Sequence, residues 1–124
     1  MSTDIPKQNL TSPFDLNDDG YVWLKGNLHS HTTNSDGKPE PQERVDGYVN
    51  QEYDFLCVSD HYKITRTDTL TAPDNFVLVQ GAELHPENPF GGQTHHFLAY
   101  NIDEDMDSKN MPPQHVINEV NRQG

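Results

Sequence analysis

The sequence predicts an α/β fold in which parallel strands carry polar side chains at one end of the sheet, as in an α/β barrel. Short apolar runs are separated by helical or loop segments, and at least three of these runs end in residue types that bind metal ions. Active-site residues of α/β barrels lie at the carboxyl ends of the strands, so we expect one shared site there. The metal-ligand residues that end the three runs are His29 with His31, His61, and Glu83.

The first strand is expected to deliver the two histidines. Residues 1–20 are polar and rich in turn formers, which predicts a lead-in to a single domain over residues 21–124. The strand should run from about Val22 to His29, and period-2 geometry places His29 and His31 on the same face. A turn over residues 34–37 can bring the Asp36 carboxylate back toward them. Imidazole nitrogens together with carboxylate oxygens suit zinc, manganese or iron.

Three further strands and two helices follow. The first helix has an acidic first turn and apolar Val45, Tyr48 and Val49 at helical spacing. The second strand is a continuous apolar run of the kind buried in parallel sheets. The predicted bounds are about Pro41–Gln51 and Pro112–Arg122 for the helices, and Asp54–Ser59, Phe76–Gln80 and His96–Ile102 for the strands.

Composition restricts the partners of the chain. The formal net charge is -12, and a surface this acidic repels phosphate backbones, so broad nucleic-acid binding is not expected. Hydrophobic residues make up 31% and the mean hydropathy is -0.90, which leaves little material for a self-sufficient core. No apolar run approaches membrane-spanning length and no signal peptide is evident, so we expect a cytoplasmic protein that does not enter a membrane. The single cysteine, Cys57, is expected to be a small buried apolar residue.

Several short motifs, taken in order, resemble the PHP (polymerase and histidinol phosphatase) metal-dependent hydrolases. These motifs are His29-Ser30-His31, Ser35-Asp36-Gly37, Ser59-Asp60-His61 and Gly81-Ala82-Glu83. The segment from Thr94 to Asp103 resembles the next segment of the family, in which a histidine precedes an apolar strand. By this placement His96 is the family histidine, with His95 the adjacent alternative. The residues from Gly26 to His31 resemble the CehA/McbA-like branch.

The resemblance implies a distorted (β/α)7 barrel that holds two or three divalent metal ions, zinc, manganese or iron. His29, His31 and Glu83 would hold the first ion, and Glu83 would bridge to a second ion that also takes His96. Asp36 and His61 would hold a third. The residues expected to contribute to catalysis are Glu83, His61 and Asp60, with Asp60 orienting the site rather than binding metal.

The chain is shorter than the family pattern. It offers about four strands and ends at Gly124, where the resemblance implies further strands and further metal ligands. We therefore expect either an N-terminal fragment, about half a barrel, or a truncated gene product. An open sheet edge in such a portion would favour self-association.

The expected function is hydrolysis of phosphoesters by a metal-activated water, with a small phosphorylated molecule as substrate. A carbamate, ester or amide hydrolase of the CehA-like type is the alternative, and a non-catalytic metal-binding fragment is another. Lys63 and Arg66 follow His61 and are candidates for phosphate contacts. His85 lies in a loop rich in proline and glycine, where an exposed position is favoured and a pocket lining is the alternative.

Overall fold

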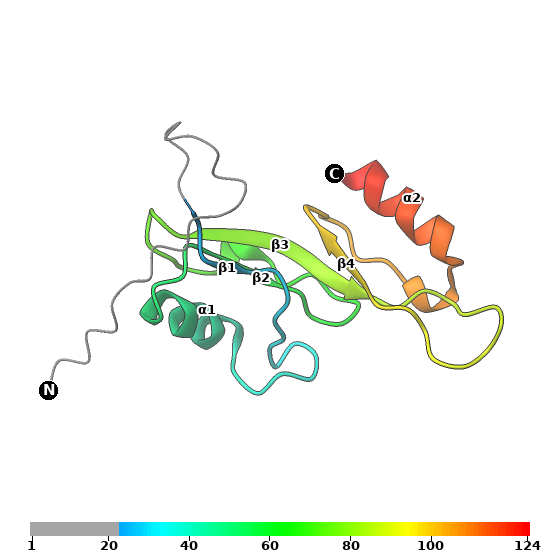
Figure 1. Ribbon diagram of the computed structural model, residues 1–124, viewed down its shortest axis with the longest axis horizontal. Coiled ribbons are helices and arrows are strands. Elements are labelled where there is room, and N and C mark those ends of the chain that lie inside the picture. Colours follow the sequence, from blue (N-terminus) through cyan, green and yellow to red (C-terminus); the bar gives the residue numbers. More distant parts are fainter. Residues whose placement is uncertain (1–22) are drawn as a thin grey trace, which may run out of the picture.

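The computed structural model describes residues 23–124 and shows a mixed α/β fold with one curled, four-stranded sheet and two helices (Figure 1). The strand order follows the sequence, so β1 and β4 form the two edges of this sheet. The predicted lead-in over residues 1–20 lies outside the described residues. The elements are β1 (Gly26–Asn27), α1 (Pro41–Asn50), β2 (Phe55–Val58), the 3-10 turn η1 (Thr67–Thr69), β3 (Val77–Leu84), β4 (Phe97–Tyr100), the 3-10 turn η2 (Ser108–Asn110) and α2 (Pro113–Gln123).

The long strand β3 joins two parts of the sheet. Its first half, residues 77–80, pairs in parallel with β2, which in turn pairs in parallel with β1. Its second half, residues 81–84, pairs with β4 in the antiparallel direction. The prediction that all strands are parallel is therefore correct for β1 to β3 and wrong for β4. The connection between β3 and β4, residues 85–96, contains no helix of the kind that usually carries the crossover to a parallel partner.

All four predicted strands differ from the structure in their bounds, since β2 and β4 are shorter than predicted and β1 and β3 differ most. β1 is only two residues long, and His29 follows it instead of lying within it. β3 extends to Leu84, so the expectation that Gly81-Ala82-Glu83 follows the end of a strand is wrong. The strand continues because β4 supplies a hydrogen-bonding partner for residues 81–84. Both helices lie within one residue of their predicted bounds.

Helix α1 packs on the sheet at the end where β2 lies. Pro41 occupies the first helical turn, and the Glu43 carboxylate accepts a hydrogen bond from the Glu40 backbone N–H at 3.3 Å. The buried face of this helix carries Val45, which packs with side chains from β2 and the start of β3. This cluster consists of Val45, Leu56, Val58 and Phe76, with Tyr48 and Val49 partly buried against it.

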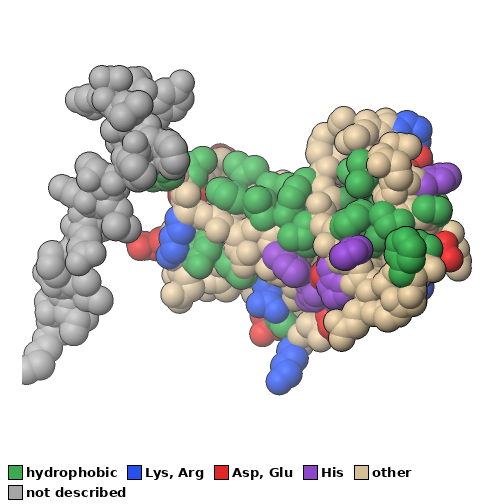
Figure 2. Space-filling view, turned by 45° about the vertical axis from the view of Figure 1, so that its right-hand side comes forward, with side chains coloured by type: hydrophobic (Ala, Val, Ile, Leu, Met, Phe, Trp, Pro, Cys, Tyr) green, Lys and Arg blue, Asp and Glu red, His purple; other side chains and the backbone are tan. Residues whose placement is uncertain are grey.

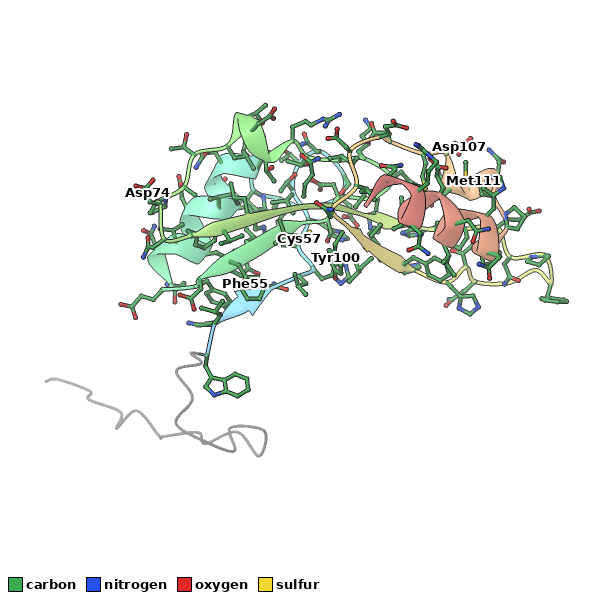
Figure 3. All side chains as sticks on the ribbon, turned by 90° about the horizontal axis from the view of Figure 1, so that it is seen from above. Phe55, Cys57, Asp74, Tyr100, Asp107 and Met111 are labelled. Carbon is green, nitrogen blue, oxygen red and sulfur yellow. The ribbon has the colours of Figure 1, made fainter. Side chains whose placement is uncertain are left out.

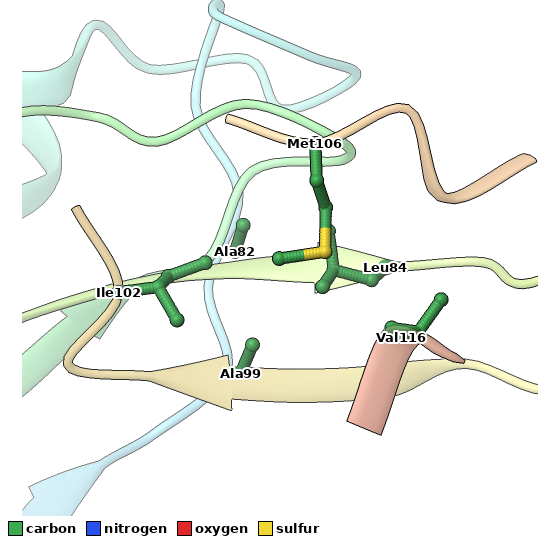
Figure 4. Close-up of a cluster of buried hydrophobic side chains, with 6 residues drawn as sticks. All are labelled: Ala82, Leu84, Ala99, Ile102, Met106 and Val116. Carbon is green, nitrogen blue, oxygen red and sulfur yellow. The ribbon is translucent and has the colours of Figure 1, made fainter. Parts of the chain in front are cut away.

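A second apolar cluster lies under α2 at the other end of β3. It consists of Ala82, Leu84, Ala99, Ile102, Met106 and Val116 (Figure 4). Ala82 and Ala99 are paired across the β3–β4 ladder, and Val116 covers them from the helix. Each cluster is small, and both lie on the same face of the sheet, because Leu56 and Val58 share a face with Ala82 and Leu84 through the parallel register.

The residues that alternate with these clusters form the opposite face. Phe55, Cys57 and Tyr100, labelled in Figure 3, belong to this face by register. Cys57 is fully buried, as predicted, and burial raises the pKa of its thiol to about 12, so the thiol stays protonated at neutral pH. Val77 is 58% exposed, which shows that this face is only partly covered.

Within residues 23–124, neither helix has the length and apolar character that crossing a membrane requires.

Candidate metal centre

His29 and His31 are aimed by the serine between them. The Ser30 backbone N–H donates to Ser59 Oγ at 3.1 Å, and the Ser30 hydroxyl donates to the Cys57 carbonyl at 2.8 Å. These bonds hold Ser30 against the end of β2, where it is buried. Since successive side chains in extended backbone point to opposite sides, the two histidines project together away from Ser30. Their Nε2 atoms lie 3.0 Å apart, as the alternation predicts.

Glu83 lies at the centre of the histidine group. Its side chain is 2% exposed, and its Oε2 lies 2.9 Å from His29 Nε2 and 2.8 Å from His31 Nε2. Its other oxygen, Oε1, lies 2.7 Å from His96 Nδ1. Figure 2 shows histidine side chains gathered on one face of the molecule. Burial raises the pKa of Glu83, but the hydrogen bond from His29 and the charge of nearby histidines outweigh burial and lower it, so the group is a carboxylate at neutral pH.

Asp36 and His61 form the other side of the group. Asp36 Oδ1 lies 2.7 Å from His31 Nδ1, and Asp36 Oδ2 lies 3.4 Å from His61 Nε2. The hydrogen bond with His31 lowers the pKa of Asp36. The turn that carries Asp36 is closed by backbone hydrogen bonds from Ser35 and Gly37 to the Thr32 carbonyl, at 3.0 and 2.9 Å. This is the return of the carboxylate toward the histidines that the turn residues predict.

Asp60 is fully buried, and four hydrogen bonds occupy its carboxylate. Thr32 donates both its backbone N–H and its hydroxyl at 2.7 Å, Ser35 donates its hydroxyl at 2.7 Å, and Thr65 donates its hydroxyl at 2.6 Å. Burial raises the pKa of Asp60, but these hydrogen bonds outweigh burial and lower it. The carboxylate therefore fixes the loop between His31 and Asp36.

The structure separates the two histidines that the sequence leaves as alternatives. Both histidines are exposed, but His96 Nδ1 lies 2.7 Å from Glu83 Oε1, whereas within residues 23–124 His95 forms no ion pair with Glu83. The antiparallel direction of β4 explains this arrangement, because its first residue lies beside the carboxyl end of β3. A histidine that precedes β4 therefore reaches the same place as residues that follow parallel strands.

His85 is not the exposed loop residue that the sequence favours. Its side chain is 14% exposed, and its Nε2 lies 2.7 Å from His61 Nδ1 and 3.9 Å from Glu83 Oε1. Its ring stacks on that of His96 with 3.9 Å between centroids. Burial, followed by the charges of His96 and His61, lowers the pKa of His85, which favours the neutral imidazole. The available signal was its spacing of two from Glu83, which puts both residues on one face of an extended chain.

The residues present fit a divalent cation. Glu83 is a buried carboxylate, and within residues 23–124 its ion-pair partners are histidines alone, with no lysine or arginine among them. Donor atoms of His29, His31 and Glu83 lie within 4.8 Å of one another, as do those of His31, Asp36 and His61. Donors around a tetrahedral zinc ion lie about 3.3 Å apart, so small side-chain shifts convert the observed hydrogen bonds into ligand positions.

The basic side chains near the site have other partners. Arg44 donates to the His31 carbonyl at 3.0 and 2.8 Å and so links α1 to the histidine loop. Arg66 pairs with the Asp103 carboxylate and donates to the Asp103 carbonyl at 2.8 Å. Lys63 is exposed. Arg66 can therefore contact a phosphate group only if its ion pair with Asp103 breaks.

Comparisons of the sequence with protein-family models and with curated proteins, and of the structure with solved structures, found no match.

Proposed function

We propose that this chain carries the metal-binding part of a PHP-type hydrolase that cleaves phosphoesters with a metal-activated water. The observation that supports the proposal best is the buried Glu83 carboxylate, whose two oxygens face different histidines. A carboxylate in this position can bridge two cations, the arrangement used by hydrolases with paired metal ions. The PHP barrel is also proposed: we interpret the curled four-stranded sheet as one part of such a barrel.

Each side chain has a defined part in this proposal. His29, His31 and Glu83 would hold one divalent ion, Glu83 and His96 a second, and Asp36 with His61 a third. Such ions lower the pKa of a bound water toward neutrality and neutralise charge on the phosphoryl oxygens. Asp60 keeps the loop from His31 to Asp36 in place through its four hydrogen bonds. Cys57 is buried and protonated, so it is not a candidate nucleophile.

The test is a panel of chromogenic substrates with added manganese or zinc. A phosphodiester and a phosphomonoester of p-nitrophenol should be hydrolysed, and His29→Ala should abolish turnover while His115→Ala, an exposed histidine on α2, should leave it unchanged. Equal rates in the wild type and His29→Ala would contradict the assignment.

A second candidate is a hydrolase of uncharged carbamates, esters or amides with the same metal site. One observation favours it: Arg44 is already engaged by the His31 carbonyl and Arg66 by Asp103. A phosphorylated substrate would then depend for its counter-charge on the bound cations and on lysines such as Lys63, which is exposed. Turnover of p-nitrophenyl acetate without turnover of either phosphoester would select this candidate.

A third candidate is a non-catalytic metal-binding chain that associates with a second copy. It is favoured by the two edges of the sheet, β1 and β4, which pair with no further strand among residues 23–124, and by exposed apolar side chains next to β1, Leu24 at 59% and Leu28 at 40% exposure. Sedimentation of the chain across a range of concentrations tests it, since a monomer at all concentrations would exclude self-association.

A further inference from the structure

His85 occupies a fixed place beside the metal-binding residues. Its backbone N–H donates to the hydroxyl of Ser108 at 3.2 Å, and Ser108 is fully buried in η2. On the other side, the Tyr62 ring lies 4.8 Å from the His85 ring, and Lys109 places its ammonium group 4.4 Å from the centre of the Tyr62 ring. These contacts hold the imidazole in the group around Glu83 and restrict its movement into solvent.

The Nε2 atom of His85 lies near possible metal-ligand atoms of His61 and Glu83. Its Nε2 lies 2.7 Å from His61 Nδ1 and 3.9 Å from Glu83 Oε1, and His61 Nδ1 lies 3.5 Å from Glu83 Oε2. One donor atom from each of the three residues lies within 4.8 Å of the others. Donors around a tetrahedral ion lie about 3.3 Å apart. The His61–Glu83 spacing of 3.5 Å is close to this value, while the two imidazole nitrogens would have to move apart and His85 would have to approach a Glu83 oxygen.

We propose that His85 is a metal ligand which, with His61 Nδ1 and Glu83, forms a cation pocket beside the one formed by His29, His31 and Glu83. The inference rests on the proposed function and adds a ligand and a pocket to it. Two imidazole nitrogens with one carboxylate select zinc, manganese or iron over magnesium and calcium.

The pocket gives His61 two competing uses. Its Nδ1 faces His85 and Glu83, whereas its Nε2 faces Asp36 at 3.4 Å. A neutral imidazole offers one lone pair, so His61 binds a cation through one nitrogen and donates a proton from the other. When Nδ1 binds the ion, the Nε2–H is placed to donate to the Asp36 carboxylate, which fixes the ring. His85 therefore decides which side of His61 faces the metal.

The test is titration of the metal-free chain with zinc and with cobalt(II). The stoichiometry is read from a competing chromophoric chelator and the coordination from the cobalt absorption bands. His85→Ala should either lose one equivalent of bound zinc or, where His61 turns its Nε2 to the Asp36 side, bind that equivalent more weakly, and its visible cobalt bands should change. The matched His95→Ala, an exposed neighbour, should bind like the wild type. His85→Cys should restore the equivalent and add a thiolate-to-cobalt charge-transfer band, because a thiolate binds both ions.

The outcomes separate this inference from the proposed function. If the wild type binds zinc and folded His85→Ala binds as many equivalents with the same affinity, the assignment of His85 is overturned and the remaining pockets stand. If His85→Ala is unfolded by circular dichroism, His85→Cys decides, and the absence of a charge-transfer band overturns the assignment. A folded wild type that binds neither ion overturns both.

Discussion

His31 and Asp36 face each other at 2.7 Å between Nδ1 and Oδ1, while the opposite nitrogen of His31 lies 2.8 Å from Glu83. A histidine whose one nitrogen donates to a carboxylate keeps the lone pair of the other nitrogen free for a metal ion. Asp36 therefore has two roles open to it, as the residue that orients His31 or as a ligand of a separate ion with His61.

Asp36→Asn separates these two roles. If Asp36 orients His31, the variant should bind the same number of zinc ions with about 10- to 100-fold weaker affinity, because the hydrogen bond is weakened but no ligand is lost. If Asp36 is a ligand, one equivalent should disappear. Isothermal titration at neutral pH measures the number of bound zinc ions and their affinity. If Asp36→Asn equals the wild type in number and affinity, Asp36 neither orients His31 nor binds an ion.

Asp60 should make the stability of the fold depend on acid. The pKa of its carboxyl is lowered in the folded chain from an ordinary value of 3.8. The carboxylate thus favours the folded state, a contribution that is complete above pH 3.8 and is lost as the pH falls through the lower folded value. Asp60→Asn should lose about 3 kcal/mol of unfolding free energy at pH 7, since its amide cannot accept all four hydrogen bonds. Urea unfolding at pH 3 and pH 5 should show a larger gain in unfolding free energy for the wild type than for Asp60→Asn. Equal gains in the two proteins would argue against this role.

The apolar clusters predict a contrast between two leucines. Leu56 is fully buried between α1 and the sheet, whereas Leu24 is 59% exposed. Leu56→Ala should cost about 2–4 kcal/mol of unfolding free energy, because it removes buried methyl groups and leaves a cavity. Leu24→Ala should change the value by less than about 0.5 kcal/mol. Chemical denaturation of both variants makes the comparison, which fails if the two changes are similar.

Alanine substitutions at two glycines should change the stability of the fold in opposite directions. A Cβ at Gly81 would collide with the Ala99 carbonyl oxygen and lie 2.9 Å from Cys57 Sγ, so Gly81→Ala should disrupt the β3–β4 ladder and lower the melting temperature. A Cβ at Gly47, inside α1, would meet nothing within 4 Å. Gly47→Ala should raise stability by about 0.5–1 kcal/mol through its higher helix propensity. Calorimetry of both variants tests the β3–β4 contact, and a tolerated Gly81→Ala would contradict it.

The sequence predicted the helices and the membership of the histidine group more closely than it predicted the sheet. Helix bounds follow from apolar residues at helical spacing and, for α1, from the acidic first turn, which are local signals. The direction of β4 depends on its partner strand, and an apolar run such as Phe97–Tyr100 reads alike in either direction. Gly81 looked like the end of a strand because glycine weakens strands, yet here its missing side chain is what allows the close approach of Ala99.

His85 was misplaced for a related reason. The residues after it, including Pro86, Gly91 and Gly92, are loop formers, and they led to the expectation of exposure. Its actual environment comes from η2 and from the ring of His96, which lie 23 and 11 residues further along the chain. The contacts with η2 and His96 leave no mark in the local sequence, and the one local signal, the alternation of Glu83 with His85, was outweighed by the loop formers that follow.

The account rests on metal binding by the group around Glu83, and a zinc titration of the wild type beside Glu83→Gln tests this most directly. The amide of glutamine keeps the size of the side chain but removes the negative charge that faces His29, His31 and His96. Glu119→Gln, on the surface of α2, is the matched control. The account predicts stoichiometric zinc binding by the wild type and the control, and loss of at least one equivalent in folded Glu83→Gln. Unchanged binding in Glu83→Gln, or no binding by a folded wild type, would contradict it.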